Sequence, residues 1–514
     1  MIKVVSNSEM RSMDARCIDT LGVPGIILME NAGRHTFEFI CDYMTENDIH
    51  GPVHIYCGKG NNGGDGYVIG RHLFNAAFNV ELISVGDPGE LKGDAQTNYR
   101  ICQNYQVPLQ IIKHRNDLKD LPEPALIVDA LLGTGLKGAV SGLMKHVVEY
   151  INSLPAPVIA VDIPSGLSGD SAAIDGPTIM ADLTITMALP KNAHLFYPAK
   201  SMVGLMEIAD ISMPDFVIND PAVKINLVEY NDLLFPVLDD DAHKYNAGKL
   251  FILAGSPGMT GAASLAASAA LRTGVGLVNV GIPAGLNAVM EVKLTEALTV
   301  PLAETASGGL SDKALPKIKE RLEWADAVVI GPGCGRDPET ISTLIGVIRI
   351  CQETGKPTLI DADALFALAQ NPKVTSTLGR NFVLTPHHGE FLRLCPLEKE
   401  NLTREPWLVL QTFLSDKLFA LNLKGAPSMV GVPEGHIYIN STGHAGLAKG
   451  GSGDVLSGII GGLMARGLEP VEAAITGNYV HGEAADLLYT NYGAMALLPS
   501  DLLAKLPEIF RLED

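Results

Sequence analysis

Short apolar runs alternate with stretches of helical periodicity along most of the chain. In the first half, five runs predict strands: Val53–Cys57, Val80–Val85, Leu126–Leu131, Val158–Val161 and Leu183–Met187. Most of these runs lack the alternating polar residues of a half-exposed strand, so we expect both faces of the sheet to be covered. Buried strands that alternate with helices predict an α/β fold with a doubly wound parallel sheet.

A second series of apolar runs follows in the second half of the chain. Its predicted strands are Lys249–Ala254, Leu277–Ile282, Ala327–Ile330, Thr358–Ile360, Phe382–Leu384 and Ser428–Val432. Between the two series lie several prolines and the acidic run Asp239–Asp241, which predict a domain boundary near residues 215–240. Neither series shows a fixed-period repeat, so a solenoid is not expected.

The first 45 residues precede the first predicted strand and read as two helices. Ser8 is the expected N-terminal cap of the first helix, and Gly22-Val23-Pro24 is its expected end. The second helix is expected from about Pro24 toward Met44.

The composition narrows the functions open to such a fold. A formal net charge of −20 at pH 7 argues against broad binding of nucleic acid or of an anionic membrane, because both need a basic surface. A phosphate-bearing ligand must then be held locally, by backbone N–H groups, helix N-termini or a bound cation.

The seven cysteines are scattered and form no CxxC pair. We therefore expect neither structural zinc nor a disulfide framework, and we expect a reducing cytoplasm. The N-terminus lacks the apolar stretch of a secretory signal, and no stretch resembles a transmembrane span of about 20 residues.

A glycine-rich segment, Gly58–Gly66, follows the predicted strand Val53–Cys57 and precedes an expected helix over Tyr67–Ala77. Its glycines allow a ligand to approach the backbone, and the helix N-terminus offers unpaired N–H groups to a phosphate. The spacing fits neither the dinucleotide-binding fingerprint nor the P-loop. A solvated turn between strand and helix is the alternative reading.

Two later strand ends carry carboxylates beside further glycines. Asp129 lies in the segment VDALLGTG, and Asp162 and Ser165 lie in VDIPSGL. Because ligands of open α/β sheets bind at the carboxyl ends of strands, these segments and the glycine-rich segment should line one crevice. Either aspartate could instead cap a helix.

The motifs CGKGNNGGDG, VDALLGTG and DIPSGL together closely resemble the NAD(P)H-hydrate epimerase family over about residues 1–215. The resemblance implies a Rossmann-like three-layer domain of residues 1–218 that interconverts the R and S forms of hydrated NADH or NADPH. Asp162 would contact the substrate and serve as the catalytic acid or base.

The same resemblance implies the remaining residues of this site. The hydrated dinucleotide would be bound by Asn61, Asn62, Gly63, Gly64 and Asp65 and by Gly133, Thr134, Gly135, Leu136, Lys137, Gly138 and Ala139. Asn62, Asp129 and Ser165 would give oxygen ligands to a potassium ion, a donor type that suits hard cations.

In the second half, three strand ends carry segments that could contact a ligand. The strand Lys249–Ala254 leads into a glycine-rich turn and an Ala-rich helix, whose small residues could also serve only close packing. Gly331–Gly335 follows the strand Ala327–Ile330. His387 and His388 follow Phe382–Leu384, but HHGE lacks the spacing of a zinc site, so contact with substrate or solvent is expected.

The segment Gly450-Gly451-Ser452-Gly453-Asp454 opens an apolar helix. Backbone N–H groups at this helix N-terminus could stabilise the charge on a transferring phosphoryl group. Asp454 is placed to take a proton from an attacking hydroxyl, although a helix-capping role would use the same residue type.

This segment resembles the ribokinase-like superfamily. With TPHHGE, GPGCG and the Lys424–Ser428 segment, it more closely resembles the ADP-dependent NAD(P)H-hydrate dehydratases, over about residues 226–508. The resemblance implies a ribokinase-like α/β domain that dehydrates the S hydrate with ADP, with magnesium neutralising phosphate charge. TPHHGE departs from the commoner TPHPGE, which leaves the role of His388 open.

The resemblance also implies which residues of this second site do what. Ala263, Gly333, His387 and Asp454 would bind the hydrated dinucleotide, Asp454 as the catalytic base, and Lys424, Gly425, Ala426, Pro427, Ser428 and Gly453 would bind ADP or AMP. A homo-oligomer is expected by analogy.

Two other classes of protein remain open at this point. A small-molecule kinase with a nucleotide-binding module in its first half would use the same GGSGD segment and the same base. A non-enzymatic scaffold would need neither Asp162 nor Asn62, which the chain carries. The preference between hydrated NADH and NADPH is not readable from the residues.

Overall fold

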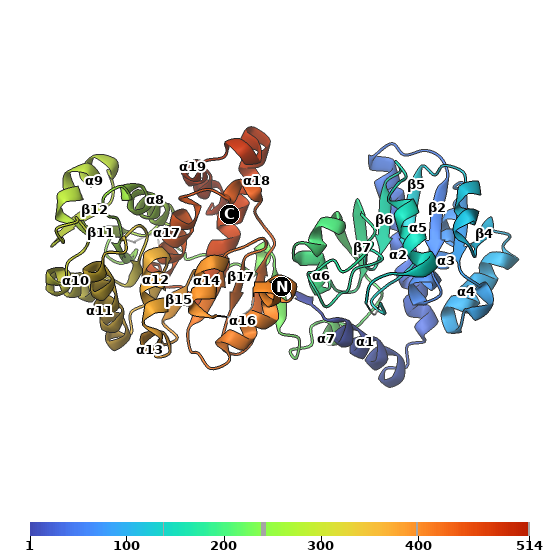
Figure 1. Ribbon diagram of the computed structural model, residues 1–514, viewed down its shortest axis with the longest axis horizontal. Helices are drawn as coiled ribbons and strands as arrows, with labels where there is room; N and C mark the ends of the chain where they lie inside the picture. The colour runs from blue at the N-terminus through green and yellow to red at the C-terminus, as the bar shows by residue number, and fades with distance from the viewer. Residues whose placement is uncertain (137, 238–242, 397–398, 512–514) are drawn as a thin grey trace. The chain divides into compact units, whose positions relative to one another are not determined.

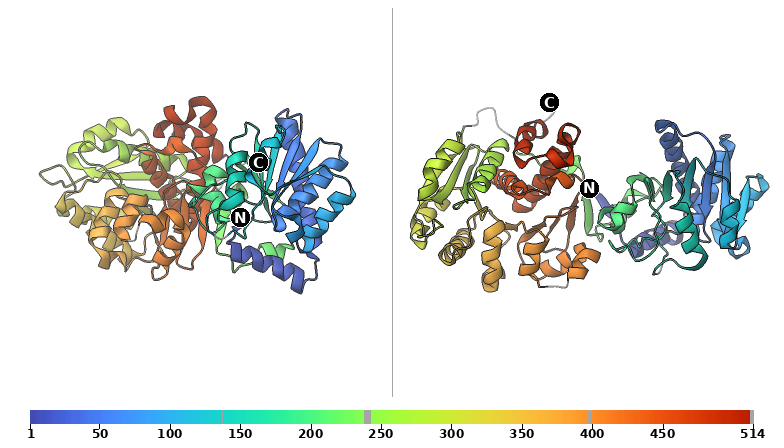
Figure 2. Two further views of the ribbon diagram at one scale, coloured as in Figure 1. Left: turned by 45° about the vertical axis from the view of Figure 1, so that its right-hand side comes forward. Right: turned by 45° about the horizontal axis from the view of Figure 1, so that its top comes forward.

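The computed structural model describes residues 1–136, 138–237, 243–396 and 399–511, so Lys137 and the acidic run 239–241 lie outside the described residues. The chain forms two compact units (Figures 1 and 2). The smaller unit holds residues 2–224 together with residues 403–405, and the larger unit holds residue 1 and the rest of the chain from residue 225 onward.

A parallel sheet forms the middle layer of the smaller unit. Its strands are β2 (Val53–Cys57), β3 (Val80–Val85), β4 (Leu109–Ile112), β5 (Leu126–Ala130), β6 (Val158–Val161), β7 (Leu183–Met187) and β8 (Leu205–Ala209). They lie in the order β4-β3-β2-β5-β6-β7-β8, and every neighbouring pair is parallel. Because the order reverses between β2 and β5, the connections after these strands lead away in opposite directions and leave a crevice between them.

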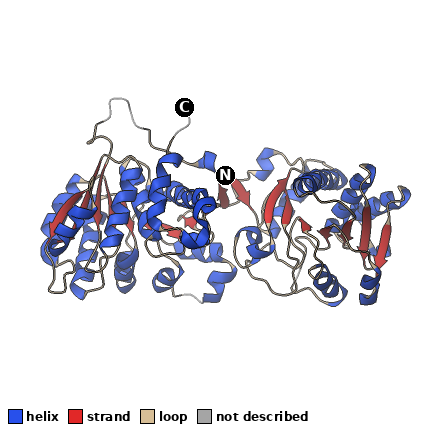
Figure 3. Cartoon of the chain, turned by 90° about the horizontal axis from the view of Figure 1, so that it is seen from above, coloured by secondary structure: helices blue, strands red, loops and turns tan. Residues whose placement is uncertain are grey.

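Helices cover both faces of this sheet (Figure 3). One face packs against α1 (Asn7–Ala15), α2 (Gly25–Glu46), α3 (Asn61–Asn75) and α4 (Gly93–Asn104), and the other face packs against α5 (Gly142–Ile151). The remaining elements are short: β1 (Ile2–Val4), α6 (Asn192–Leu195) and α7 (Asp215–Ile218). Every residue of β2, β5, β6 and β7 is buried, which explains why these runs lack polar alternation and confirms the predicted covered parallel sheet.

The larger unit is built around a second, mainly parallel sheet. Its strands are β9 (Ile225–Val228), β10 (Lys249–Leu253), β11 (Leu277–Pro283), β12 (Leu298–Leu302), β13 (Ala327–Ile330), β14 (Thr358–Ile360), β15 (Phe382–Leu384), β16 (Ala420–Leu423), β17 (Met429–Gly431) and β18 (Ile437–Asn440). Their order is β9-β18-β17-β16-β15-β14-β13-β10-β11-β12. Strand β17 runs antiparallel to β16 and β18, and the order reverses between β13 and β10.

Two layers of helices cover this sheet as well. One face packs against α8 (Thr260–Arg272), α9 (Asn287–Lys293), α17 (Ser452–Ala465), α18 (Pro470–Ala496) and α19 (Pro499–Ile509). The other layer contains α10 (Leu315–Trp324), α11 (Pro338–Thr354) and α12 (Ala362–Gln370) (Figure 1). Shorter helices complete the unit: α13 (Pro372–Thr375), α14 (His388–Leu394), α15 (Lys399–Arg404) and α16 (Pro406–Leu414).

The small residues of α8 have a packing role, because this helix lies directly against α17. A Cβ atom added to Gly458 of α17 would lie 2.1 Å from the carbonyl oxygen of Ala266 of α8. One added to Gly462 would lie 2.2 Å from the Thr273 hydroxyl. The backbones of α8 and α17 therefore approach as closely as glycine and alanine allow.

Two predictions about the first hundred residues were wrong. Ser6 caps α1, not Ser8: its hydroxyl accepts from the Glu9 amide at 3.1 Å, and Glu9 Oε2 accepts from the Ser6 amide at 2.7 Å. The segment from Asn61 to Gly66 was expected as a loop, but it forms the first turns of α3, with Gly60 as the N-cap.

The glycines of this segment serve close packing rather than a flexible turn. A Cβ atom on Gly63 would lie 2.0 Å from the Gly58 carbonyl oxygen, and one on Gly66 would lie 2.7 Å from the Cβ of Ala130. Helix α3 can therefore begin immediately beside the end of β5. This contact between distant parts of the chain outweighs the low helix propensity of glycine.

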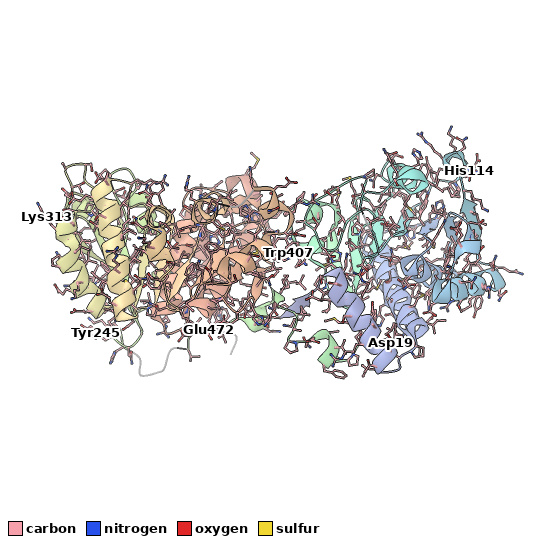
Figure 4. All side chains as sticks on the ribbon, turned by 60° about the horizontal axis from the view of Figure 1, so that its bottom comes forward. Asp19, His114, Tyr245, Lys313, Trp407 and Glu472 are labelled. Carbon is pink, nitrogen blue, oxygen red and sulfur yellow. The ribbon has the colours of Figure 1, made fainter. Side chains whose placement is uncertain are left out.

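Polar side chains that point away from the ribbon, such as Asp19, His114 and Lys313, lie at the surface of their units (Figure 4). Among the described residues, none of the helices has the length and apolar character needed to cross a membrane.

We expect Gly458→Ala to lower the free energy of unfolding of the larger unit by about 1–3 kcal/mol, because its methyl group would overlap the backbone of α8. Denaturant unfolding followed by hydrogen exchange of the α8 and α17 amides measures this. Gly261→Ala is the matched control, since a Cβ atom there has no neighbour within 4 Å. Equal stability of the two variants would contradict this packing.

Candidate active sites

Buried charges mark two places in the protein. Of the described residues, six aspartate, glutamate or lysine side chains are buried: Asp65, Asp129, Lys191, Asp361, Asp363 and Glu390. Three lie near the carboxyl ends of strands in the smaller unit, and three lie near those of β14 and β15 in the larger unit. Burying a charge costs free energy unless an opposite charge or hydrogen bonds compensate it, so buried charges often mark functional sites. These two strand edges are therefore the candidate sites.

Asp162 lies at the carboxyl end of β6 in the smaller unit. Its backbone is left-handed, with φ 67°, and its amide donates to the Ile185 carbonyl at 2.8 Å. Such a conformation is unfavourable for a residue other than glycine and is typical of functional sites. It does not cap a helix, so that alternative is excluded for this residue.

Lys191 holds the Asp162 side chain. Its side chain is fully buried, and its Nζ donates to Asp162 Oδ1 at 2.5 Å, to Thr186 Oγ1 at 2.9 Å and to the Met187 carbonyl at 3.2 Å. All three protons of the ammonium group are thereby used. Burial alone would raise the pKa of Asp162, but the charge and hydrogen bond of Lys191, helped by His194, hold it below its ordinary value.

Two further carboxyl groups near Asp162 and Lys191 have raised pKa values, in contrast to Asp162. Burial, together with the charges of Asp162 and Asp14, raises the pKa of Asp65 well above its ordinary value. Burial also raises the pKa of Asp14 on α1 to about 6, against the attraction of Lys191. A carboxylate of lowered pKa beside carboxyl groups of raised pKa is an arrangement suited to acid–base chemistry.

The amide of Asn62 lies near Asp162. A Cβ atom on Gly133 would lie 3.4 Å from the Asn62 Cβ and 3.5 Å from Asp162 Oδ2, so these groups line one space. Asn62 is 7% exposed, and neither polar atom of its amide has a hydrogen-bond partner among the residues that the structure describes. A buried amide without a partner is rare and indicates a place for a ligand.

The other predicted residues of this site are distributed around the crevice between β2 and β5. Asn61 is exposed and Gly63 and Gly64 are buried in the first turns of α3. Residues 133–136 and 138–139 form a half-exposed to exposed connection after β5, and Lys137 lies outside the described residues.

Asp129 and Ser165 are bound to each other. The Ser165 hydroxyl donates to Asp129 Oδ1 at 2.7 Å, and the Ser165 amide donates to Oδ2 at 2.8 Å. Burial raises the pKa of Asp129 to about 6, against the hydrogen bonds from Ser165 and Leu131. Asp129 caps no helix; it is a buried carboxylate with no cationic side chain beside it in the described structure.

The second candidate site lies at the switch point of the larger sheet. The Gly255 amide after β10 donates to the Pro332 carbonyl after β13 at 2.9 Å, and the Ser256 hydroxyl donates to the Gly333 carbonyl at 2.8 Å. Helix α17 begins beside these turns. Its N-cap, Gly451, has a φ of 101° and offers no side chain to cap the first turn. The Ser452 amide donates to the Lys449 carbonyl at 3.2 Å, so the amides that follow it in this turn are the ones suited to a ligand.

Asp454 lies in the first turn of α17, and the cap position belongs to Gly451. Burial and, after it, the charge of Asp361 raise its pKa to about 7, while the charge of Lys424 opposes both. A carboxyl group with such a pKa can accept a proton near neutral pH. Lys424 Nζ lies 3.3 Å from where a Cβ atom of Gly453 would be.

The Lys424–Ser428 segment joins β16 to β17. The Lys424 amide donates to the Pro386 carbonyl at 2.9 Å, which ties this segment to the turn after β15. In that turn, His387 caps α14 by accepting from the Gly389 amide at 3.0 Å. The His388 Nε2 lies 3.2 Å from where a Cβ atom of Gly425 would be, so His388 borders the predicted nucleotide segment.

Ala263 and Gly333 belong to the floor of this site. The Ala263 side chain is fully buried in the packing of α8, 3.4 Å from a Cβ position on Gly255. Gly333 adopts a left-handed φ of 62°. No cluster of three or more His, Cys, Asp or Glu side chains that could bind a metal occurs among the described residues.

Sequence reasoning missed three side chains that the structure brings to these sites: Asp14, Lys191 and Asp361. Asp361 directly follows the predicted strand Thr358–Ile360, which is a signal the sequence offered, but no glycine-rich segment accompanies it. Lys191 lies four residues beyond the predicted strand Leu183–Met187. Asp14 lies near the C-terminal end of α1, where the sequence offers no signal of a site.

Family models match both units of the chain. A model described as NAD(P)H-hydrate dehydratase matches residues 250–508, and one described as YjeF-related protein N-terminus matches residues 25–193. A ribokinase-like superfamily protein from Enterococcus faecalis V583 superimposes with a TM-score of 0.50 at 24% identity, over 56% of this chain and 96% of that one. The fold and sites thus define a protein that joins a Rossmann-like unit to a ribokinase-like unit.

Full-length relatives carry the same two units. The chain is 38% identical to a bifunctional NAD(P)H-hydrate repair enzyme of Moorella thermoacetica, over 99% of this chain and 96% of the relative. It is 33% identical to the enzyme of that name from Escherichia coli K12, over 98% and 92%. The chain belongs to the family of bifunctional NAD(P)H-hydrate repair enzymes.

We expect Lys191→Met to destabilise the smaller unit by about 3–5 kcal/mol, because it leaves the buried Asp162 carboxylate without its cation. Denaturant unfolding, followed by hydrogen exchange of the β5–β7 amides, measures the loss. The double variant Lys191→Met/Asp162→Asn should recover much of it, since the buried charge is gone. Additive losses in the double variant would show that the two side chains do not act as a pair.

Proposed function

We propose that the smaller unit interconverts the R and S forms of hydrated NADH and NADPH, and that the larger unit dehydrates the S form with ADP. The observation that carries this proposal is one partly buried aspartate with a shifted pKa at the candidate site of each unit, in a chain whose relatives are named for this repair. We assign residues 1–218 to the first activity and residues 226–508 to the second.

Epimerisation needs the hydroxyl at C6 of the reduced nicotinamide ring to leave and return. The neighbouring ring nitrogen supplies the electron pair as the C–O bond breaks, and the planar cation that results accepts the hydroxyl on either face. Asp162 is the group that we propose to move the proton, because Lys191 keeps it ionised. Asp65 and Asp14, which hold their protons more tightly, are proton donors within the same cluster.

The potassium site predicted from the sequence fits the residues present. Asn62 Oδ1 is buried without a hydrogen-bond partner, and Asp129 is a buried carboxylate with no cationic side chain beside it in the described structure. We propose that Asn62, Asp129 and Ser165 hold the ion through oxygen atoms. Bound there, potassium would neutralise the charge of Asp129.

Dehydration needs a better leaving group than hydroxide. We propose that Asp454 takes the proton of the C6 hydroxyl while that oxygen attacks the β-phosphorus of ADP and AMP leaves. Phosphate then departs from C6, a proton leaves C5, and the C5–C6 double bond of the reduced ring is restored. The first N–H groups of α17 and the Lys424 ammonium are the groups of this chain that would stabilise the charge of the phosphoryl group.

We assign the nucleotide to Lys424–Ser428 and Gly453, and the hydrated dinucleotide to Ala263, Gly333, His387 and Asp454. Magnesium usually arrives on nucleotide phosphates and keeps several waters, so it needs few protein ligands. The lack of a converging carboxylate cluster among the described residues is consistent with magnesium carried by ADP, where it would neutralise phosphate charge. The described cysteines are all unpaired thiols, which suits the cytoplasmic location that we propose.

We expect Asp454→Asn to lower the rate of dehydration at least about 100-fold and to leave epimerisation unchanged, because a base is lost from one unit only. Recovery of the absorbance of reduced nicotinamide, with AMP formation, measures dehydration of the S hydrate. Interconversion of the separated R and S hydrates measures epimerisation.

Asp162→Asn is the reciprocal variant and should abolish epimerisation while dehydration of the S hydrate continues. Loss of both activities in either variant would contradict two independent sites. If the wild type left hydrated NADH and NADPH untouched and phosphorylated another small molecule, the protein would be a kinase and the proposal would be wrong.

The pH dependence of dehydration should report the Asp454 carboxyl group. Because Asp454 must be ionised to accept a proton and its pKa is raised to about 7, kcat/KM should rise with pH through about 7 and level off above it. Initial rates with saturating ADP measure this pH dependence. They are taken from about pH 5 to about pH 9, which is about two pH units on either side of the Asp454 pKa. A rate that is flat down to pH 5 would exclude Asp454 as a base with a raised pKa.

A further inference from the structure

Asp361 is a buried carboxylate that has no role in the dehydration mechanism proposed above. It follows β14 directly, its residue is 1% exposed, and its amide donates to the Ile330 carbonyl of β13 at 3.0 Å. The next residue, Ala362, has a left-handed φ of 49°. The backbone therefore fixes the carboxylate at the same strand edge as Asp454, and at a conformational cost.

Both oxygens of Asp361 are occupied by groups from other elements. Oδ1 accepts from Lys424 Nζ at 2.8 Å, and Oδ2 accepts from the Ser457 hydroxyl at 2.7 Å. Ser457 lies one turn beyond Asp454 on α17. The carboxylate thus links the segment after β16 to the helix that carries the proposed base.

Lys424 is held at one point and is otherwise available. In the described part of the chain, its ammonium group has Asp361 as its single hydrogen-bond acceptor, so two of its three protons are left for a ligand. Its side chain is 19% exposed, whereas that of Asp361 is 2% exposed. In this ion pair the Asp361 carboxylate is buried, whereas the Lys424 ammonium group is partly exposed and can still bind an anion.

The charges around Asp454 come from few side chains. Asp361 approaches it from the end of β14, Asp363 from the first turn of α12, and Lys424 from the end of β16. From α18, His481 Nε2 lies 3.2 Å from the Ser452 hydroxyl, and burial lowers the pKa of His481 to about 4, so it is neutral near pH 7. Toward Gly451, α8 and α19 present Leu265 and Pro499, which carry no charge.

We propose that Asp361 is a positioning residue of the dehydratase site, which aims the Lys424 ammonium at the phosphates of ADP and places a second negative charge beside Asp454. The inference rests on the proposed function of the larger unit. The inference adds Asp361, which acts through two other residues. It acts on Lys424 by a hydrogen bond and on Asp454 by the electrostatic effect of its charge.

The two partners of the pair should act on Asp454 in opposite directions. Asp361 raises its proton affinity and Lys424 lowers it. Removing the Asp361 charge frees Lys424 to neutralise Asp454, whereas removing the Lys424 charge leaves two carboxylates facing each other. A residue that only supports the fold would give no such opposition.

The experiment uses the full-length chain with Asp361→Asn, Lys424→Met and the double variant. Asp361→Asn should move the pH limb of kcat/KM for dehydration to lower pH by about 1 unit, and Lys424→Met should move it to higher pH. Each single variant should weaken ADP binding, measured by calorimetry without the hydrated dinucleotide, by about tenfold or more. The double variant should bind ADP no more weakly than Lys424→Met, because Asp361 acts on ADP through Lys424.

The outcomes separate this inference from the proposed function. If the wild type neither dehydrates the S hydrate nor binds ADP, the proposed function fails. If the wild type does both, and Asp361→Asn leaves the pH limb and the ADP affinity in place, the inference is overturned. If Asp361→Asn does not fold, Lys424→Met still tests the inference. The inference is overturned if the pH limb of kcat/KM for dehydration in Lys424→Met is unchanged or moves to lower pH.

Discussion

In each unit, one lysine ammonium group holds an aspartate carboxylate at the end of a parallel strand. Lys191 does so for Asp162, and Lys424 does so for Asp361. Burial alone would raise the pKa of Asp162, because low dielectric disfavours its charge, and Lys191 holds that pKa below its ordinary value. The first pair sets the pKa of Asp162, and the second pair places a negative and a positive charge beside Asp454, so the chemistry that we propose depends on both.

The two lysines do this in different ways. The ammonium group of Lys191 donates all three protons to acceptors within the protein, so it holds Asp162 in place and has no proton available to donate to a substrate. The ammonium of Lys424 has one protein partner within the described structure and lies at the edge of the crevice. The first is suited to set the ionisation of a base, and the second to bind an anion while it influences a base nearby. A net charge of −20 makes such local cations necessary for a phosphate-bearing ligand.

Sheet topology brings these groups together. In both units the strand order reverses, between β2 and β5 and between β13 and β10, and the candidate sites lie at these reversals. Close packing of helices onto the strand ends makes the sites compact. Gly63 lets α3 begin against Gly58, and Gly458 lets α17 lie against α8, so both helix N-termini face the crevices.

The sequence by itself determined the two parallel sheets, because a strand depends on a local pattern. The glycine-rich segments at their edges and the choice of Asp162 and Asp454 as candidate site residues were also predicted from local patterns. The sequence did not reveal that Asn61–Gly66 is helical, since that depends on the fit of α3 against β5. It also missed Lys191 and Asp361 as partners, because Lys191 pairs with a residue 29 positions away and Asp361 with one 63 positions away. Such pairs depend on which strands are neighbours in the sheet, and only the tertiary structure decided that order.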